Sequence, residues 1–563
     1  MKNNAKSSAE AYTCGEITPQ KLKKRGLHPY WERLSQIYSL IILAIFPLIT
    51  ETEGYSNTTY VKWIWFCVIS CVYIAFCGFL FFNFTDAKIK RERLSEGVAP
   101  VTLPQAFIIA YMIWGTLSSL VSDYAINLWG AEGRYEGLAS LLLYGLVFIL
   151  LSYWGEFSDK LVYAVAAMAF IMGMVCVLQM FGVNLYPIKN ASLGLRYTYW
   201  ETFFLGTLGN IDVLAGVTVM VVPFLAGSYI FIKKKLDWLW LPGLGLLLFV
   251  QGFSGVDSGR LGLLAALAVM LPFAVTTKEH LSRTLTVGAV ASFSFAMSKF
   301  LNFTPEILSA GEDSKSIIYK TKISLNFDKM FILLAALTVV LIAGKIILAR
   351  YVKNEFKTNP EKITKIVFIA LGVCVVAALV FLFFYTGTNT ILSEIHEILH
   401  GRLADDAGSG RGRTWKVSAK LIAQQPIFGF GAGMFYTVFW PYNGSGGIFD
   451  LAHNDFIQVA FCSGLIGLLL YLGFIVTLAV RAFKATKKTK LVVIFIGACA
   501  GYLVHSFFSF SIAIVSPWFW VLAGMLDHLI RQLPTEAGEK TFKWSNVFGS
   551  CKKTFSKIKN KNA

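Results

Sequence analysis

Charged residues are scarce in this sequence. Only 15% of its 563 residues are Asp, Glu, Lys or Arg, whereas an ordinary soluble domain carries roughly a quarter. Hydrophobic residues make up 56%, and the mean hydropathy is +0.60, which excludes an ordinary soluble enzyme. Apolar runs at 137–154, 261–277 and 364–385 approach the roughly 20 residues that a membrane-crossing helix needs, and they lack the alternation of a membrane barrel. We therefore predict an all-α integral membrane protein with about fourteen transmembrane helices.

Acidic residues are the rarer charge: 33 Asp and Glu stand against 51 Lys and Arg, a formal net charge of +18. The basic residues form short clusters between apolar runs and disfavour a nucleic-acid-binding surface. Basic residues mark cytoplasmic loops of membrane proteins. We assign to the cytoplasm the N-terminus at 1–33, the C-terminal tail at 532–563, and the clusters at 88–93, 233–235, 278–283, 350–357 and 481–490. The membrane domain is expected to span 34–531.

Several other signals are missing. Residues 1–33 are polar and basic, so no cleavable signal peptide is expected. The nine cysteines are scattered and give neither a disulfide framework nor a metal-binding spacing. His396 and His400 are four residues apart, but no third ligand is evident nearby, and a solvated helix face explains them better. We predict no metal site and no cofactor.

One connection is far longer than the rest. The predicted outer segments are 51–60, 122–136, 182–205, 254–260, 299–328, 387–452 and 511–515, and the segment at 387–452 runs to about 65 residues, a length that is usually functional. Its stretches SEIHEILH and TWKVSAKLIAQQ predict short helices. Gly429, Gly431 and Gly433 then predict a tight turn.

Within this long loop, short motifs follow one another in a fixed order. They are an Arg followed at the fourth position by Trp, a Pro-x-x-Gly-x-Gly turn, and a His-Asn segment before Gly-x-x-Gly, carried here by Arg411, Trp415, Pro426, Gly429, Gly431, His453, Asn454, Gly464 and Gly467. With GAEGRYEGL at 130–138, GTLGNIDVLAG at 206–216 and SGVDSGRLGLL at 254–264, the chain resembles the O-antigen ligase and polymerase superfamily of bacterial envelope glycan transferases. The resemblance covers about 120–530.

The resemblance implies a metal-independent, inverting glycosyltransferase in the bacterial inner (plasma) membrane. The donor is expected to be a glycan on a polyisoprenyl (undecaprenyl) diphosphate carrier, and the acceptor a hydroxyl of a glycan, lipid or protein. The active site is expected on the extracytoplasmic face, in the loop at 387–452.

The chemistry calls for cations, because negative charge grows on the leaving diphosphate as the glycosidic bond breaks. Arginine binds phosphate with a planar fork and stays charged. Arg260 at the outer end of a helix, and Arg411 or Arg413 in the outer loop, are candidates, with catalytic roles expected for Arg260 and Arg411. The alternatives are a headgroup contact for Arg260 and a solvated surface for one member of the pair. Arg134 is a further substrate-binding candidate, although Glu132 and Glu136 beside it offer a local ion pair.

His453 is the predicted general base, since a neutral imidazole can accept the proton of the acceptor hydroxyl. Helix capping or an interfacial position is its alternative. Asn454 and Asn210 are predicted to bind diphosphate or glycan, and helix capping is the alternative for Asn210. His505 is expected to be a packed helix residue near the outer boundary.

Two further functions stay open. A polymerase, whose acceptor is another lipid-linked glycan, differs from a ligase only in the acceptor. A flippase for lipid-linked oligosaccharides has a similar number of helices, but transporters usually place charges near the bilayer midplane, whereas here the charges lie at helix ends.

Overall fold

The computed structural model of the protein describes residues 29–51, 55–84, 101–181, 183, 206–310, 317–354, 356, 359–387, 390–443 and 449–533. Most of the basic N-terminus, the cluster at 88–93, most of the predicted outer segment at 182–205 and nearly all of the C-terminal tail lie outside the described residues. The predictions for these segments remain untested.

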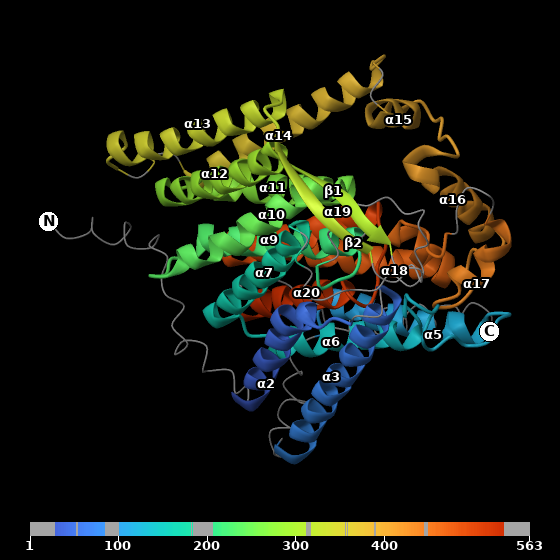
Figure 1. Ribbon diagram of the computed structural model, residues 1–563. Helices are drawn as coiled ribbons and strands as arrows, with labels where there is room; N and C mark the ends of the chain where they lie inside the picture. The colour runs from blue at the N-terminus through green and yellow to red at the C-terminus, as the bar shows by residue number, and fades with distance from the viewer. Residues whose placement is uncertain are drawn as a thin grey trace, which may run out of the picture.

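Helices dominate the described structure (Figure 1). The long helices are α2 (Pro29–Leu40), α3 (Tyr55–Phe84), α5 (Leu103–Val121), α6 (Leu138–Trp154), α7 (Asp159–Met180), α9 (Ile211–Phe231), α10 (Trp240–Ser254), α11 (Asp257–Ala274), α12 (Lys278–Phe300), α13 (Lys329–Tyr351), α14 (Pro360–Phe383), α18 (Asp455–Ala485), α19 (Leu491–Phe507) and α20 (Ser516–Gln532). Short helical turns η2 (Ile41–Ile45) and η3 (Phe46–Leu48) extend α2, and η4 (Asp237–Leu239) precedes α10.

Among the described residues, eight helices are long and apolar enough to cross a membrane: α3, α5, α7, α9, α11, α13, α14 and α18. Two shorter apolar helices, α6 and α19, lie in the same bundle. These helices confirm a multi-pass helical membrane protein. The number of fourteen crossings remains a prediction.

Helix α9 forms the centre of the bundle. Nearly all of its residues are buried, and it packs against α10, α11 and α19. Small residues permit this close approach: a Cβ on Gly227 would lie 3.1 Å from the Cα of Ile494, and one on Gly262 of α11 would lie 2.6 Å from the carbonyl oxygen of Gly501 of α19. Such contacts set the helix positions tightly. Helix α14 is the opposite case, because none of its residues is buried within the protein.

The segment expected as the outer loop at 299–328 contains a hairpin. Strands β1 (Leu301–Ala310) and β2 (Ile317–Leu325) pair antiparallel, with Leu301 opposite Leu325. The hairpin connects α12 to α13 (Figure 1).

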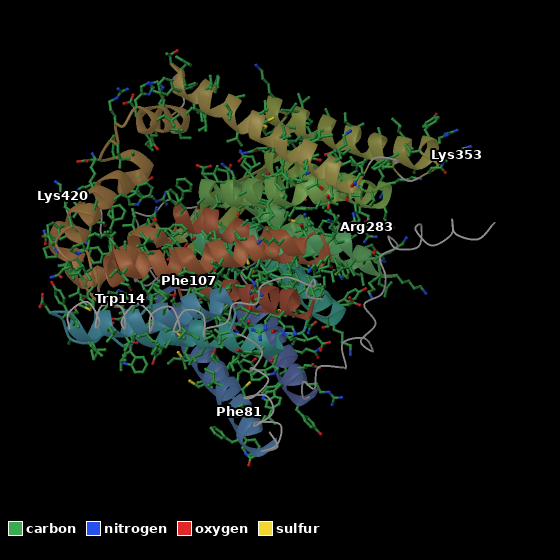
Figure 2. The ribbon with its side chains drawn as sticks, turned by 180° about the vertical axis from the view of Figure 1, so that it is seen from behind. Phe81, Phe107, Trp114, Arg283, Lys353 and Lys420 are labelled. Atoms are coloured by element: carbon green, nitrogen blue, oxygen red, sulfur yellow. The ribbon has the colours of Figure 1, made fainter. Side chains whose placement is uncertain are left out.

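The two ends of the bundle differ in the residues they carry. Arg283 and Lys353, both from predicted cytoplasmic segments, lie at one end, and Lys420 of the long loop lies at the other (Figure 2). The end with Lys420 carries the short helices α15 (Thr390–Leu399), α16 (Ala407–Ile422) and α17 (Phe435–Phe439) and the turn η5 (Trp440–Tyr442). Helices α15 and α16 contain most of the two stretches predicted to be helical, and the assignment of 387–452 as an extracytoplasmic loop remains a prediction.

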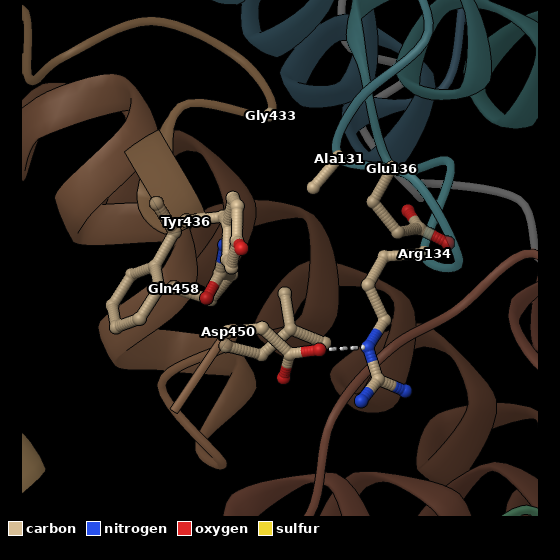
Figure 3. Close-up of a pocket in the computed structure, with 9 residues that line it drawn as sticks. Ala131, Arg134, Glu136, Gly433, Tyr436, Asp450 and Gln458 are labelled. Atoms are coloured by element: carbon tan, nitrogen blue, oxygen red, sulfur yellow. Dashed lines mark hydrogen bonds and ion pairs between the residues drawn. The ribbon is translucent and has the colours of Figure 1, made fainter. Parts of the chain in front are cut away.

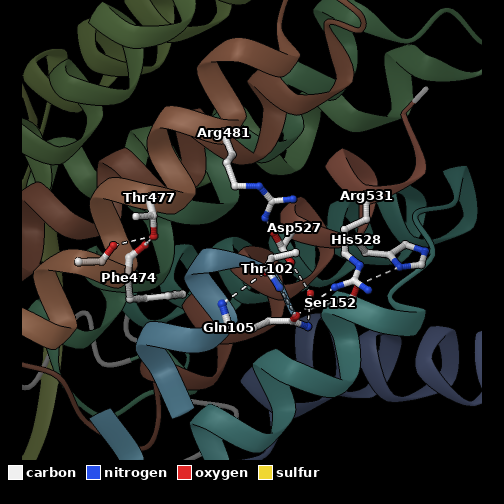
Figure 4. A network of polar contacts seen from close by, with 10 residues as sticks. Thr102, Gln105, Ser152, Phe474, Thr477, Arg481, Asp527, His528 and Arg531 are labelled. Carbon is white, nitrogen blue, oxygen red and sulfur yellow. Dashed lines mark hydrogen bonds and ion pairs between the residues drawn. The ribbon is translucent and has the colours of Figure 1, made fainter. Parts of the chain in front are cut away.

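A buried polar network ties four helices together near the opposite end of α18 (Figure 4). The carboxylate of Asp527 in α20 is fully buried and forms an ion pair with Arg481 of α18. It also accepts hydrogen bonds from Thr102, at the N-cap of α5, and from Ser152 of α6. A buried charge is tolerated when it is paired and hydrogen-bonded, so this network fixes α18 from its far end.

Candidate functional site

The glycine-rich turn after α16 packs directly on a break in α18. Gly464 lies inside α18 with φ +67° and ψ −178°, which interrupts the helix. A Cβ on Gly464 would lie 2.0 Å from the carbonyl oxygen of Ile427, and one on Gly429 would lie 2.5 Å from the amide nitrogen of Gly464. Gly429, Gly431 and Gly433 all have positive φ, as the predicted turn requires.

Backbone hydrogen bonds then join the two segments. The amide of Phe430 donates to the carbonyl of Phe461 at 3.0 Å, and that of Gly431 donates to Cys462 at 2.9 Å. Ser118 of α5 donates to the Cys462 carbonyl at 2.9 Å. The motif glycines therefore serve to hold the long loop against α5 and the start of α18.

Arg411 begins the regular part of α16. Gly408, Ser409 and Gly410 all have left-handed backbone angles, so helical geometry starts only after them. The guanidinium of Arg411 makes no hydrogen bond or ion pair with any residue that the structure describes. Its charge nevertheless acts on Asp212 and His453. Arg411 is thus a half-buried cation without a fixed partner in the described part of the chain.

His453 sits in a strained turn just before α18. Its φ is +50°, a conformation that costs energy for a residue other than glycine and that is often found at functional sites. The turn is held on both sides: Trp415 Nε1 donates to the Ala452 carbonyl at 2.9 Å, and Asn454 caps α18 by accepting from the Ile457 amide at 3.0 Å. The ring of His453 contacts the ring of Phe510 edge-on at 5.0 Å between centroids.

Arg134 reaches the same place from the loop between α5 and α6. Its Nε donates to the carboxylate of Asp450 at 2.7 Å, and its Nη1 donates to the hydroxyl of Tyr55 at 2.8 Å. Its guanidinium also lies 4.8 Å from the ring centroid of Phe510. The ion pair of Arg134 is with Asp450, so the alternative of a local ion pair with Glu132 or Glu136 is wrong. Asp450 is 316 residues away in the sequence, and a local pattern could not indicate it.

These charges shape the protonation of His453. Burial, together with the positive charges of Arg411 and Arg134, lowers the pKa of His453 to about 4, and Asp450 offsets this only partly. The Nδ1 atom of His453 is buried and has no hydrogen-bond partner among the described residues. At neutral pH the imidazole is therefore uncharged and can accept a proton.

A small open pocket lies beside Arg134, between its loop and α17 (Figure 3). Polar side chains of Arg134, Asp450, Tyr436, Glu136 and Gln458 line it, together with Ala131, Gly433, Phe435 and Leu451.

The remaining predicted site residues lie in different surroundings. Arg260 at the start of α11 pairs with Asp257 at 2.7 Å, is 39% exposed, and is not among the charges that act on His453. Arg413 is exposed, and its Nη2 donates to the carbonyl of Tyr442 at 3.0 Å. Asn210 caps α9 by accepting from the Asp212 amide at 2.8 Å.

Both asparagines therefore use their side-chain oxygens as helix caps, which leaves only their amide nitrogens for a ligand. The structure brings Arg134, Arg411, His453 and Asn454 together and leaves Arg260 and Arg413 in other contacts. His505 is buried in α19, as predicted.

The described residues contain no group of three or more His, Cys, Asp or Glu side chains that could hold a metal ion. His396 and His400 are half-buried rather than solvated. Nδ1 of His396 lies 3.1 Å from the Leu382 carbonyl oxygen, and the ring of His400 stacks on Phe383 at 4.3 Å.

Two partners in the site were not predicted, Asp450 and Tyr55. The only sequence signal for Asp450 is its position three residues before His453, and Tyr55 carries none.

The helical bundle and the cluster of arginines and histidine at one of its ends define a multi-pass membrane protein with a cationic, histidine-bearing site. Residues 330–472, about a quarter of the chain, match the family model described as O-antigen ligase. This match confirms, over that range, the resemblance to the O-antigen ligase and polymerase superfamily. The matched range contains Arg411, Arg413, His453 and Asn454, and excludes Arg134, Asn210 and Arg260. No curated protein matches the chain.

Proposed function

We propose that the protein transfers a glycan from a polyisoprenyl (undecaprenyl) diphosphate carrier to an acceptor hydroxyl on the extracytoplasmic face of a bacterial plasma membrane. The observation that carries the proposal is that Arg411, a cation without an ion-pair or hydrogen-bond partner among the described residues, acts electrostatically on His453, a buried neutral base. The family match supports the same reaction class.

In the proposed reaction the acceptor oxygen attacks the anomeric carbon of the donor glycan. The bond from that carbon to the phosphate oxygen breaks, and the carrier leaves as a diphosphate anion. His453 accepts the hydroxyl proton, and Arg411, assisted by Arg134, stabilises the charge that grows on the diphosphate. A single displacement of this kind inverts the anomeric configuration.

The charges of the site support these roles for His453 and the two arginines. Protonation of His453 is unfavourable beside two guanidiniums, but a bound diphosphate neutralises them and raises the basicity of the imidazole. The imidazole of His453 therefore becomes a sufficiently strong base mainly when the donor is bound. Because arginines supply the positive charge, transfer is expected to proceed without a metal ion.

The catalytic role predicted for Arg260 and the diphosphate contact predicted for Arg413 remain predictions, although each residue already has a partner within the chain. Asn210 and Asn454 remain predicted ligands through their amide nitrogens.

The test is glycan transfer by the detergent-solubilised protein from a purified polyprenyl-diphosphate donor, with EDTA present. Wild type is expected to form product, and His453→Ala and Arg411→Ala are expected to lose it while remaining folded. Product that grows by repeated units indicates a polymerase, and a single conjugate indicates a ligase. Movement of the lipid across liposome bilayers without any transfer would overturn the proposal in favour of a flippase.

A further inference from the structure

Beneath the arginine and histidine cluster lies a second set of polar groups that the proposed reaction does not use. Glu136 accepts a hydrogen bond from the hydroxyl of Tyr144 in α6 at 2.8 Å. Asp455, the first residue of α18, accepts one from Tyr471 at 3.3 Å. Asp455 is buried, and Glu136 is only partly exposed, at the edge of the pocket.

Hydroxyl groups connect the two carboxyl groups. Glu136 interacts with the hydroxyl of Ser516 at the start of α20, and Asp455 interacts with that of Ser511. Tyr502 of α19 lies between these serines, with its hydroxyl 2.9 Å from Ser511 Oγ and 3.5 Å from Ser516 Oγ. A continuous chain of hydroxyls thus links the loop of Glu136 to the start of α18.

Each of the two carboxyl residues follows a residue of the proposed catalytic site at the same spacing in the sequence. Glu136 follows Arg134 by two residues, and Asp455 follows His453 by two residues. In each segment the first residue faces the cationic cluster and the second faces the hydroxyl chain. The hydroxyl chain that holds Glu136 near Asp455 therefore also holds Arg134 in position relative to His453.

No cation in the described part of the chain acts on either carboxyl. Arg134 of the same loop is directed to Asp450 (Figure 3), and it also donates a hydrogen bond to Tyr55. The titratable groups that face Glu136 from the packed elements are neutral tyrosines or acidic: Tyr111 of α5, Tyr144 of α6, Asp455 of α18 and Tyr502 of α19.

Negative charges on the buried Asp455 and on the partly exposed Glu136 repel each other, and protonation of one carboxyl relieves this repulsion. The start of α18 favours a negative charge on Asp455. Glu136 is then the protonated partner.

We propose that Glu136 is a positioning residue, which in its protonated form holds the Arg134 loop against the start of α18 and on ionisation releases it. The proposal rests on the proposed function, because it explains how the arginine and the histidine of that site keep their relative position.

Burial, with a smaller contribution from Asp455, raises the pKa of Glu136 to about 8, so the protonated form predominates at neutral pH. Transfer should therefore fall as the pH rises through this value. If only the protonated form is active, the active fraction at pH 9 is about tenfold lower than at pH 7.

The test compares wild type with Glu136→Gln, Glu136→Ala and the matched control Glu132→Gln, which changes an exposed acid of the same loop. Transfer and thermal stability are measured from pH 6 to 10. Glutamine preserves the neutral hydrogen-bonding form, so Glu136→Gln is expected to stay within about twofold of wild type at pH 7 and to lose the alkaline fall. Glu136→Ala is expected to be weak at every pH, and Glu132→Gln to match wild type.

Thermal stability is a readout that does not need turnover. A carboxyl whose pKa is raised on folding contributes stability below its unfolded pKa, and that stability is lost as the pH rises through the folded value. The melting temperature of wild type should therefore fall as the pH rises from 6 to about 8 and lose this dependence above that value, and that of Glu136→Gln should fall less.

Absence of transfer by wild type would count against the proposed function alone, because the melting curves still test Glu136. An unchanged alkaline fall in both measurements for Glu136→Gln would overturn the positioning role. So would a folded Glu136→Gln variant without transfer at pH 7, which would assign the ionised carboxylate a catalytic role instead.

Discussion

Replacing Arg411 by glutamine should separate the two arginines of the long loop. Arg411 has no partner among the described residues and acts electrostatically on His453, whereas Arg413 is exposed and bonded to the Tyr442 carbonyl. Removing a group that stabilises developing charge typically costs about 10²–10³ in rate. Removing an exposed charge costs at most about 1 kcal/mol, or about fivefold. Arg411→Gln should therefore reduce transfer at least tenfold more than Arg413→Gln does.

The same variant should change the pH dependence of the residual activity. The pKa of His453 falls from its ordinary value of 6.5 to about 4, with burial as the larger cause and Arg411 as the next. Loss of the Arg411 charge should move it upward by part of this difference of about 2.5. Only neutral imidazole accepts a proton, so the acidic limb of kcat/KM should shift to higher pH in Arg411→Gln and stay in place in Arg413→Gln.

The assay is transfer from a purified lipid-diphosphate glycan between pH 4 and 8, with folding checked by size-exclusion chromatography. Equal losses for the two arginine variants, or an acidic limb that does not move in Arg411→Gln, would refute the reasoning.

Three further changes have defined outcomes. His453→Gln should lower kcat by about 10²–10⁴ with little change in donor affinity measured by equilibrium binding, and a loss confined to binding would contradict the base assignment. Gly464→Ala should prevent stable folding, because its Cβ would overlap the Ile427 carbonyl oxygen, whereas Gly372→Ala, in open space on α14, should not lower the melting temperature. Asp527→Ala leaves Arg481 without its partner and should destabilise the protein by about 3–5 kcal/mol in denaturation of the solubilised protein. The exposed Lys484→Ala should be neutral, and equal stabilities of these two variants would argue against the network in Figure 4.

The helical class could be predicted from the sequence because long apolar runs leave few alternatives in a bilayer. The runs at 137–154, 261–277 and 364–385 correspond to α6, α11 and α14. The break in α18 could not be predicted in the same way. Gly464 lies in a mainly apolar stretch, and only its contact with Ile427, from another part of the chain, shows why the helix must stop and restart there.

Within the site, local signals were informative only where neighbours in sequence are neighbours in space. Helix capping was the alternative considered for His453, and the cap of α18 is formed by its neighbour Asn454. The ion pair of Arg134 could not be predicted, since two acids adjacent in sequence were available and the actual partner, Asp450, is 316 residues away. The role of Glu136 could not be predicted for the same reason, because the residues around it come from five different helices, α5, α6, α18, α19 and α20.

The equal spacing of Arg134 from Glu136 and of His453 from Asp455 limits how the two segments can change during evolution. Substitutions elsewhere in either segment change only the packing around them. Insertion or deletion of one residue within either pair would turn the carboxyl group of that pair toward the donor diphosphate, and its arginine or histidine toward the buried hydroxyl groups. The lengths of these short segments should therefore vary less than their composition. A homologue with a gap at either place is expected to have lost transfer while keeping the helical bundle.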